Sequence, residues 1–574
     1  MPKRNLIPDD ERSEAWPHPP DRSAGPQVRR VWFKIGAIGA GLLPLLLLEL
    51  GLRLGNFGRP SASPDPSAGF NRNVPLFEQE GAVFRTARGR APFVAPQEFP
   101  VKKPANGSRI FCFGGSTVYG HPYLGETAFP RWLELELAAS DPARSWQVIN
   151  AGGVSYASYR IVPLVQEVLA YQPDLIILAT GHNEFLEDRT YQTLKERSAL
   201  WAWLQRKISA LHTVGLARQW LSPDTVRSPS RDRTTSPRPH LDPNARTRLD
   251  TASGYASYRR DDEWHRRVVA QFDESVRSII AHCEAAKIPI ILVGLGTNLR
   301  DCPPFKSEHR LNLGPEPEAD WQAAFDLATA TEKFDLSRAL QFYLEAAAID
   351  GEHALLNYRI GRVLDRLNRS AEALTYFQRA KDQDICPLRI VKPLQQVLAR
   401  VVAETHVPWV DAEQLLADRS PNHLPGYDWY VDHVHPTIAG HQIIARALAG
   451  QMQARSFWVP ASVWGEDQRE HAYTRHLDEL GPGYFADGNR RVGWLENWAQ
   501  RQRLAAELKP NDAPGFARLG FRHLDLGEDD AAWAALSEAL HRDPAIRTLI
   551  TQRAQALRSA GRSDRAATLL QKFD

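Results

Sequence analysis

The strongest constraint on the fold is an alternation of apolar runs and amphipathic segments between residues 109 and 181. Three apolar runs, RIFCFGG, WQVINAGG and DLIILATG, are separated by two segments of helical periodicity, FPRWLELELAAS and YRIVPLVQEVLAY. A strand followed by a helix and another strand forms a parallel pair, because the helix returns the chain across the sheet. The pattern therefore predicts an α/β domain with a parallel sheet covered by helices on both faces.

Two later apolar runs extend this sheet. They are IPIILVGLG, at 288–296, and VPWVDA, at 407–412, and each follows a segment of helical periodicity. A basic stretch rich in Pro and Ser, at 228–248, interrupts the pattern, and its composition favours a mobile surface loop. We expect a single α/β domain in two parts, 105–310 and 388–450.

The segment between these two parts contains helical patterns only. Small and aromatic residues recur there at a spacing of 34 positions: Ala339, Tyr343 and Ala346, then Ala373, Phe377 and Ala380. This period is typical of tetratricopeptide repeats, in which small residues permit close helix packing. The same template fits the C-terminal region at Leu519-Gly520, Ala532, Ala539, Pro544 and Ala566. Such repeats either bind a peptide or partner protein or serve only as helical supports for the α/β domain.

A long apolar segment lies near the N-terminus. It runs from Val31 to Leu54 and contains charges only at Lys34, Glu49 and Arg53. As a helix it would be roughly 36 Å long, enough to cross a bilayer with some tilt. The preceding Arg29-Arg30 pair places the N-terminus inside the cell. We expect a single-pass anchor in the plasma (inner) membrane, with the rest of the chain outside the cytoplasm. In a Gram-negative cell this location would be the periplasm. The alternatives are a buried helix and a cleaved signal peptide.

Composition excludes other classes of function. Seventy Lys and Arg against 68 Asp and Glu leave a formal charge of +2, which gives no global reason to expect a nucleic-acid partner. The four cysteines have no C-x-x-C spacing, so we expect no zinc module. Two buried and two loop thiols are expected, with pairing of Cys302 and Cys386 as the alternative. A dinucleotide site is disfavoured because FGGSTVYG lacks the G-x-G-x-x-G spacing.

Four short motifs follow predicted strands or occupy loops. They are GGST at 114–117, NAGG at 150–153, GHNE at 181–184 and DHVHP at 432–436. The order serine, glycine, asparagine, histidine resembles the SGNH (GDSL-type) hydrolase superfamily, and the inserted repeats resemble membrane-anchored members that carry tetratricopeptide repeats. The resemblance implies a flavodoxin-like three-layer α/β/α core, with no cofactor and no metal. It covers the α/β domain and leaves out the termini and the repeats.

The chemistry of acyl transfer assigns the roles of these residues. A serine hydroxyl needs an adjacent base, so Ser116 is the expected nucleophile, His435 the base and Asp432 the carboxylate that orients the imidazole. Gly114 and Gly115 are expected to let the backbone turn sharply and expose the hydroxyl. Pro436 is expected in the first turn of the next helix.

The resemblance also implies an oxyanion hole made by the Ser116 N–H, a glycine N–H and the Asn183 side chain. Gly153 is the assigned glycine, with the adjacent Gly152 left open. The chain departs from the G-D-S-L block at Gly115 and Thr117. Glu184 stands where the superfamily has aspartate after the asparagine. None of these departures falls on a proton-transfer group, so activity is expected to survive.

Three further features remain open. His433 competes with His435 as the base, but only His435 combines the D-x-x-H spacing with a following proline. His182 is expected to be structural or to line the pocket. The PFKSEH loop, at 304–309, either lines the pocket or is an ordinary polar loop.

The hypothesis that follows is an extracytoplasmic serine esterase for acyl or O-acetyl esters of a small molecule, lipid or glycan. An O-acyltransferase acting on a glycan and a repeat-based interaction scaffold are the alternatives. Activity is expected to fall as His435 becomes protonated. The predicted organisation is a polar tail (1–30), a transmembrane helix (31–55), a linker (56–104), the first part of the core (105–310), repeats (320–387), the second part (388–450), a linker (451–499) and C-terminal repeats (500–574).

Overall fold

The computed structural model describes residues 43–44, 47–53, 55, 74–91, 93–190, 212–213, 257–457, 466–507, 513–526, 529–559 and 562–573. The chain forms two compact units, Met1–Ser63 with Ser198–Thr235, and Pro64–Arg197 with Ser236–Asp574. In the first unit, the Glu49 carboxylate accepts hydrogen bonds from the N–H groups of His212 and Thr213. The predicted tail, most of the predicted transmembrane segment and the 228–248 loop lie outside the described residues. No helix among the described residues has the length and apolarity needed to span a bilayer.

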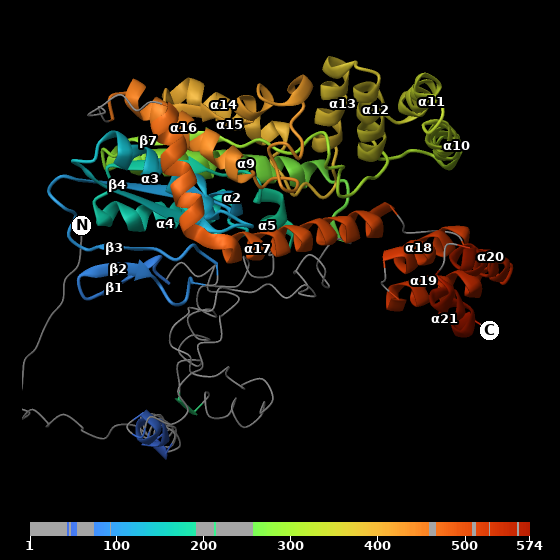
Figure 1. The fold of residues 1–574 in the computed structure, drawn as a ribbon, viewed down its shortest axis with the longest axis horizontal. Coiled ribbons are helices and arrows are strands. Elements are labelled where there is room, and N and C mark those ends of the chain that lie inside the picture. Colours follow the sequence, from blue (N-terminus) through green and yellow to red (C-terminus); the bar gives the residue numbers. More distant parts are fainter. Residues whose placement is uncertain are drawn as a thin grey trace, which may run out of the picture. The chain divides into compact units, whose positions relative to one another are not determined.

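The core of the second unit is a five-stranded parallel sheet (Figure 1). Its strands are β4 (Gly107–Gly114), β5 (Ser145–Gly152), β6 (Leu175–Ala179), β7 (Ile290–Gly294) and β8 (Trp409–Asp411). The spatial order is β5-β4-β6-β7-β8, and each neighbouring pair is parallel. Numbered along the sheet, this order is 2-1-3-4-5, as in flavodoxin-like doubly wound folds. The predicted parallel sheet is confirmed, and each of the five apolar runs forms one strand.

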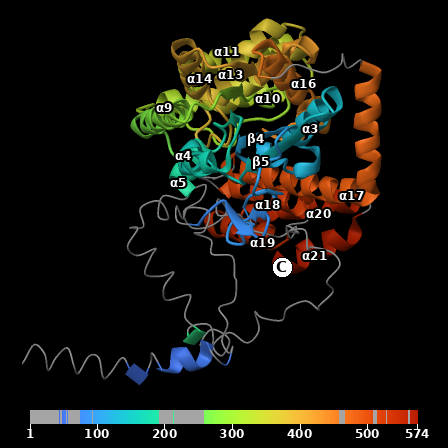
Figure 2. The same ribbon diagram turned by 90° about the vertical axis from the view of Figure 1, so that its left-hand side faces the viewer.

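Alternate side chains of the strands point to opposite faces of the sheet, and each face has its own apolar core. Phe111 and Phe113 of β4 pack with helices α4, α9 and α14, which span Ser158–Val168, Asp262–Ala285 and Lys392–Thr405. Ile110 and Cys112 pack with α3 and α16 on the other face, at Phe129–Ser140 and Ile438–Ala454. Figure 2 shows β4 and β5 between α4 and α9 on one side and α3 on the other.

The region predicted as a linker at 56–104 contains a small antiparallel sheet. Its strands are β1 (Phe77–Glu80), β2 (Val83–Thr86) and β3 (Glu98–Pro100). Phe99 packs edge-on against Phe77 and Phe111, with ring centroids 4.9 and 5.6 Å apart. The linker prediction is therefore wrong for residues 77–100, because aromatic side chains in these short strands join the main core.

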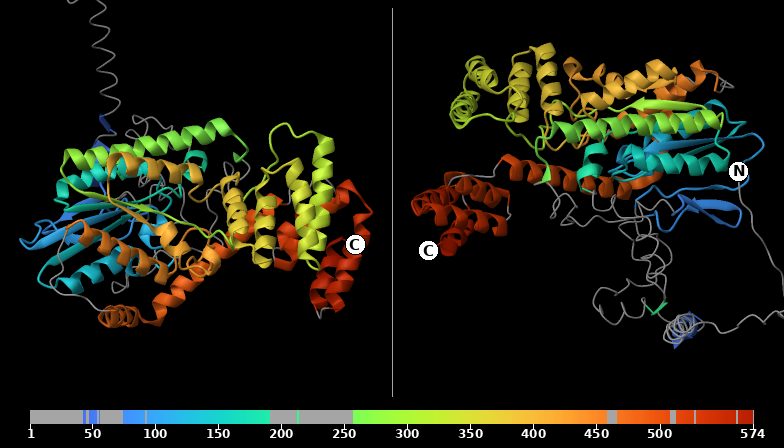
Figure 3. Two further views of the ribbon diagram at one scale, coloured as in Figure 1. Left: turned by 90° about the horizontal axis from the view of Figure 1, so that it is seen from above. Right: turned by 180° about the vertical axis from the view of Figure 1, so that it is seen from behind.

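The insertion consists of four helices that pack side by side (Figure 3). They are α10 (Pro315–Thr331), α11 (Leu336–Ile349), α12 (Ala354–Arg366) and α13 (Ser370–Asp382). All six residues of the 34-residue pattern are buried between these helices. The described residues after α17 (Glu466–Glu507) form four helices as well, α18 (Ala513–Leu526), α19 (Asp529–Arg542), α20 (Ile546–Ser559) and α21 (Ser563–Phe573). Their assignment as tetratricopeptide repeats stays a prediction.

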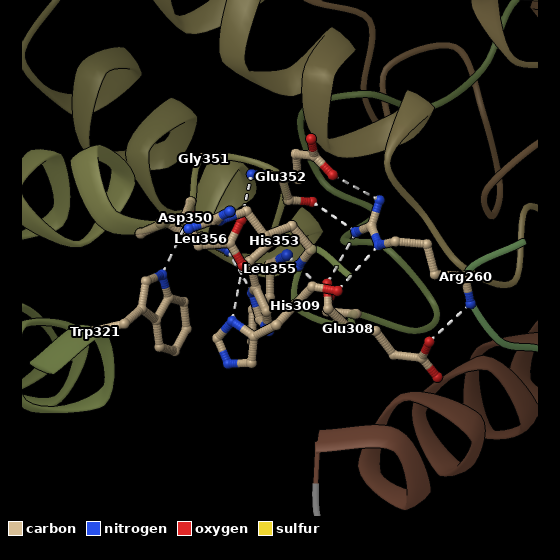
Figure 4. A network of polar contacts seen from close by, with 12 residues as sticks. Arg260, Glu308, His309, Trp321, Asp350, Gly351, Glu352, His353, Leu355 and Leu356 are labelled. Carbon is tan, nitrogen blue, oxygen red and sulfur yellow. Dashed lines mark hydrogen bonds and ion pairs between the residues drawn. The ribbon is translucent and has the colours of Figure 1, made fainter. Parts of the chain in front are cut away.

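A polar network attaches the insertion to the α/β domain (Figure 4). Arg260, which precedes α9, donates to the backbone oxygens of Glu308 and His309 and pairs with Glu352 of the insertion. The fully buried Asp350 carboxylate accepts from His309 Nδ1 at 2.8 Å. Because these contacts include partly buried backbone oxygens and the buried Asp350 carboxylate, the insertion is bound to the loop after β7 as well as joined to it through the chain.

The segment predicted as a linker at 451–499 is mostly helical. Helix α17 covers Glu466–Glu507 and bends at Gly481, whose φ of 70° precedes Pro482. Arg469 and Tyr473 both bind the Glu136 carboxylate of α3. The linker prediction is therefore wrong for this helix, since it packs along the core.

All four cysteines are buried free thiols. Cys302 and Cys386 lie in loops, as expected, but both are buried. The alternative, a disulfide between them, is not formed.

Candidate active site

Ser116 lies directly beyond the end of β4. It is the first residue of the short helix α2 (Ser116–Tyr119). A Cβ at Gly114 would lie 2.1 Å from the Ala179 oxygen at the end of β6, and a Cβ at Gly115 would lie 2.5 Å from Asn183 Nδ2. Gly115 has φ −85°, which other residues also adopt. The reason for glycine at 115 is therefore close approach rather than an unusual backbone angle, which corrects the expectation.

The structure brings together the three residues expected to form a triad. His435 Nε2 lies 2.7 Å from Ser116 Oγ, and His435 Nδ1 lies 2.6 Å from Asp432 Oδ2. Ser116 is partly exposed, whereas Asp432 and His435 are buried. A serine hydroxyl that solvent can reach is thus hydrogen-bonded to a buried imidazole, which is hydrogen-bonded in turn to a buried carboxylate.

The loop that carries the histidine is a tight turn. Tyr430 and Pro436 form an antiparallel bridge, and the Val431 N–H donates to the His435 oxygen at 2.9 Å. Thr437 caps α16 by accepting from the Gly440 N–H. Pro436 therefore precedes the cap instead of lying in the first turn as expected, and His435 remains in the loop.

Asp432 has two functions in this turn. Its Oδ1 accepts the N–H groups of Val434 and His435, both at 2.8 Å, while Oδ2 accepts from the imidazole. Burial alone would raise the pKa of Asp432, but the neighbouring His435 and His433 and these hydrogen bonds hold it well below its usual range. The carboxylate is therefore ionised, and it fixes Nδ1 as the protonated nitrogen, which leaves the Nε2 lone pair facing Ser116.

The site occupies the position where an open parallel sheet holds ligands. Ser116 follows β4 and Asn183 follows β6, and the two strands are neighbours in the sheet. From β4 the chain continues to β5 on one side, and from β6 it continues to β7 on the other side. The carboxyl ends of strands at such a switch point diverge and leave a crevice. The order of strands thus brings the serine and asparagine motifs together.

The Ser116 N–H and the Asn183 side chain are two of the three expected oxyanion donors. The Ser116 N–H is in the first turn of α2, where a helix offers no acceptor of its own. The buried Asn183 amide lies beside Gly115 and donates to the Tyr156 oxygen at 3.2 Å, which uses one of its two hydrogens. Among the described residues, the second hydrogen of this amide has no acceptor.

The glycine assignment is corrected. The Gly153 N–H donates to the Gly114 oxygen at 3.0 Å, continuing the ladder between β5 and β4. The alternative, Gly152, donates to the Asn150 side chain at 3.0 Å. The Gly153 N–H is used in pairing with the neighbouring strand and the Gly152 N–H by a side chain two residues earlier, so neither is available to an oxyanion in this conformation.

The competing histidines lie elsewhere around the site. His433 Nδ1 is 3.7 Å from Asp432 Oδ2, and its ring packs against Phe305 at 5.0 Å. His182 Nδ1 accepts from the Ile390 N–H at 3.1 Å, and burial lowers the pKa of His182 well below its usual value. His435, and neither of these two, contacts the Ser116 hydroxyl.

The 304–309 loop divides between two environments. Phe305 lies beside His433, where the Asp384 carboxylate at the end of the insertion accepts the Phe305 N–H at 2.7 Å. Glu308 and His309 belong to the network that binds the insertion (Figure 4). One end of this loop therefore borders the site, and the other does not.

Sequence reasoning missed two groups near the base. The His121 ring centroid lies 5.1 Å from that of His435, and burial, together with His435 and Arg491, lowers the pKa of His121 to about 3. Arg491 of α17 donates to the Pro122 oxygen. Only the nearness of His121 to Ser116 in the sequence could have indicated its place, and nothing in the sequence pattern indicated Arg491.

Among the described residues, no three His, Cys, Asp or Glu side chains are grouped so that they could hold a metal ion. The arrangement of Ser116, His435 and Asp432 supports transfer of the serine proton to an imidazole stabilised by a buried carboxylate. The result would be a serine nucleophile next to amide donors that can bind a developing negative charge.

Comparison with solved structures finds distant similarities. The chain is similar to an acetylxylan esterase from Geobacillus stearothermophilus, with 13% identity and a TM-score of 0.27 over 61% of this chain and 96% of that one. It is also similar to a GDSL-like lipase from Bacteroides thetaiotaomicron, with 11% identity and a TM-score of 0.25 over 61% and 89%. No protein-family model and no curated protein matches the chain. The geometry of this chain's own residues, Ser116, His435 and Asp432, carries the assignment of function.

Proposed function

We propose that the chain is a serine esterase that hydrolyses acyl or O-acetyl esters through an acyl-Ser116 intermediate. The observation that supports this proposal is the line of hydrogen bonds from Ser116 Oγ through the imidazole of His435 to the Asp432 carboxylate, at 2.7 and 2.6 Å. The serine and the histidine are 319 positions apart in the sequence. A serine with only a turn-forming role needs neither a base nor a buried carboxylate behind that base.

The proposed reaction has two halves. Ser116 Oγ attacks the ester carbonyl carbon while His435 Nε2 takes the hydroxyl proton, and Asp432 stabilises the imidazolium that forms. The Ser116 N–H and the Asn183 amide bind the oxyanion. The intermediate then collapses: the bond to the alcohol oxygen breaks, and that oxygen receives the proton from Nε2. Water, activated by the same imidazole, attacks the acyl-serine and releases the acid.

The location of the enzyme is part of the proposal. The apolar segment Val31–Leu54, preceded by Arg29-Arg30, supports a single-pass anchor with the catalytic domain outside the cytoplasm. The repeating small and aromatic residues, buried in the helices of 315–382, support an assignment of this insertion as tetratricopeptide repeats.

The test uses the full-length protein, a fluorophosphonate probe and p-nitrophenyl acetate. Labelling and hydrolysis are expected in the wild type and not in Ser116→Ala, while Ser337→Ala, at an exposed serine of α11, should retain both. Equal labelling of the wild type and Ser116→Ala would refute the proposal. Adding a sugar acceptor and analysing the products distinguishes hydrolysis from acyl transfer, because both use the same acyl-enzyme.

A further inference from the structure

The segment that carries the nucleophile reaches solvent at two residues. Within 108–121, every residue is buried except Ser116 and His121, which are both partly exposed. The two are joined through the backbone, because the His121 N–H donates to the Ser116 oxygen at 3.0 Å. The helix between them, α2, is buried at Thr117, Val118 and Tyr119. On this segment, His121 is therefore the residue that borders the opening at the nucleophile.

Both ring nitrogens of His121 are open to solvent. Among the described residues, none donates to or accepts from either nitrogen, and the contact of the ring is with His435, edge-on at 5.1 Å. Neither nitrogen is one of the buried side-chain atoms that lack a partner, as His182 Nε2 is. Protein atoms nevertheless surround the ring, and this burial, with His435 and Arg491, lowers the pKa of His121 to about 3. A ring that is enclosed by protein and yet has both nitrogens accessible lines a crevice.

The state of this imidazole indicates which chemical group it can bind. A neutral imidazole has one N–H that donates and one nitrogen that accepts. A hydroxyl group also donates once and accepts, so it can bind either nitrogen of His121 in either tautomer. A carboxylate would find one donor beside a lone pair that repels it, and an ammonium group would find one acceptor beside a competing donor. The ring is therefore best suited to a hydroxyl.

His121 is attached at the end of the catalytic imidazole where the alcohol of an ester must lie. His435 Nε2 faces Ser116 Oγ, and His121 is bound to the Ser116 backbone. Asp432 binds Nδ1, and His433 lies beside Asp432 at that other end. During acyl transfer the alcohol oxygen faces Nε2, which protonates it as it leaves. A group on the carbon next to the alcohol oxygen is therefore within reach of His121.

Resting on the proposed esterase function, we infer that His121 is a specificity-determining residue that binds a hydroxyl of the alcohol portion of the substrate. The substrate class is an ester of a polyol, such as a sugar, in which the carbon next to the esterified one carries a free hydroxyl. This hydrogen bond holds the alcohol oxygen toward His435 Nε2, so polyol esters react faster than esters of simple alcohols of the same size.

The experiment measures hydrolysis of 2-hydroxyethyl acetate and propyl acetate by the full-length protein. The two esters have the same acyl group and nearly the same size, and a hydroxyl in the first replaces a methyl group in the second. His121→Phe keeps a ring beside His435 but removes both nitrogens. Its kcat/KM for the hydroxylated ester is expected to fall about tenfold relative to that for propyl acetate. Either His121→Asn or His121→Gln, which places an amide near one ring nitrogen, should restore most of this loss.

The readout is the ratio of the two kcat/KM values, because the difference in intrinsic reactivity between the esters is the same for every variant. His282→Phe is the matched control. It is the same change at a partly buried histidine in the last turn of α9, close to the start of β7 and thus at the edge of the sheet opposite the site. The ratio and both rates should remain those of the wild type.

Two results would overturn the inference. One is an unchanged ratio in His121→Phe, which includes an equal loss on both esters, and the other is failure of both amide variants to restore the ratio. If His121→Phe fails to fold, the ratio measured in His121→Leu decides in the same way. The proposed function itself fails only if neither ester is hydrolysed in a manner that depends on Ser116.

Discussion

Replacing Asp432 by asparagine separates the two functions of this side chain. Its Oδ1 holds the turn by accepting two N–H groups at 2.8 Å, and its Oδ2 accepts from His435 Nδ1 at 2.6 Å. In Asp432→Asn the amide oxygen must stay with the two N–H donors, because an NH₂ group there would face two other donors. The turn is therefore retained, and the new NH₂ group faces Nδ1.

This orientation of the amide selects the wrong tautomer of His435. Nδ1 has to accept from the new NH₂ group, so the proton moves to Nε2, which then points at Ser116 Oγ and has no lone pair to take its proton. The loss expected for a triad with the wrong tautomer is about four orders of magnitude in kcat, or roughly 5 kcal/mol of barrier. KM should change little, because the carboxylate does not touch the substrate.

The assay is hydrolysis of p-nitrophenyl acetate by full-length Asp432→Asn, with urea unfolding to compare stability. Asp428→Asn is the matched control: it is the same change in the same loop, at a side chain that pairs with Arg300. A kcat within tenfold of the wild type, in a variant that folds normally, would refute the assignment of Asp432 as the residue that orients the base.

Three other single changes test the surroundings of the triad. Gly115→Ala places a Cβ 2.5 Å from Asn183 Nδ2 and must displace that amide, so kcat is expected to fall by about a hundredfold to a thousandfold, as for loss of one oxyanion donor. The kcat of Asn183→Ala should fall by a similar factor, and the kcat of the double variant should fall no further than that of either single variant. If the two losses in kcat multiply instead, the two changes act independently, and the proposed displacement of Asn183 is refuted. Burial raises the pKa of Glu184 from 4.5 to about 7, against hydrogen bonds from Ser158 that lower it. The folded state therefore binds this proton more tightly than the unfolded state, and stability falls by up to about 3 kcal/mol as pH rises across this interval. Urea unfolding of Glu184→Gln between about pH 4.5 and about pH 7 should give a flatter profile, and an unchanged slope would contradict the assignment.

The sequence indicated the strands because their apolar runs and intervening helices need no distant information. IFCF, at 110–113, and LIILA, at 175–179, are apolar throughout, as is typical of strands covered on both faces, and both lie in the sheet. The D-x-x-H spacing likewise placed Asp432 and His435 in one turn, because residues three positions apart can meet without any tertiary contact.

Other features depended on contacts between segments far apart in the chain. Gly153 was assigned as an oxyanion donor because its motif is local, but its N–H is used by Gly114 of the neighbouring strand. Residues 77–100 and helix α17 were expected to be linkers because their composition is polar or irregular, yet a few aromatic and charged side chains attach them to the core. A sequence pattern reflects the average polarity of a segment, whereas the packing of that segment against the core depends on a few individual side-chain contacts.

The sequence by itself therefore determined the parallel α/β architecture and the residue types of the triad, because hydrophobic periodicity and short-range spacing are properties of the chain. Only the tertiary structure decided that Ser116 and His435 meet, that Gly153 is occupied, and that His121 lies against the base. The physical reason is that a hydrogen bond or ring contact depends on positions fixed to within about an ångström by the packing of the whole core, and no local pattern encodes such positions.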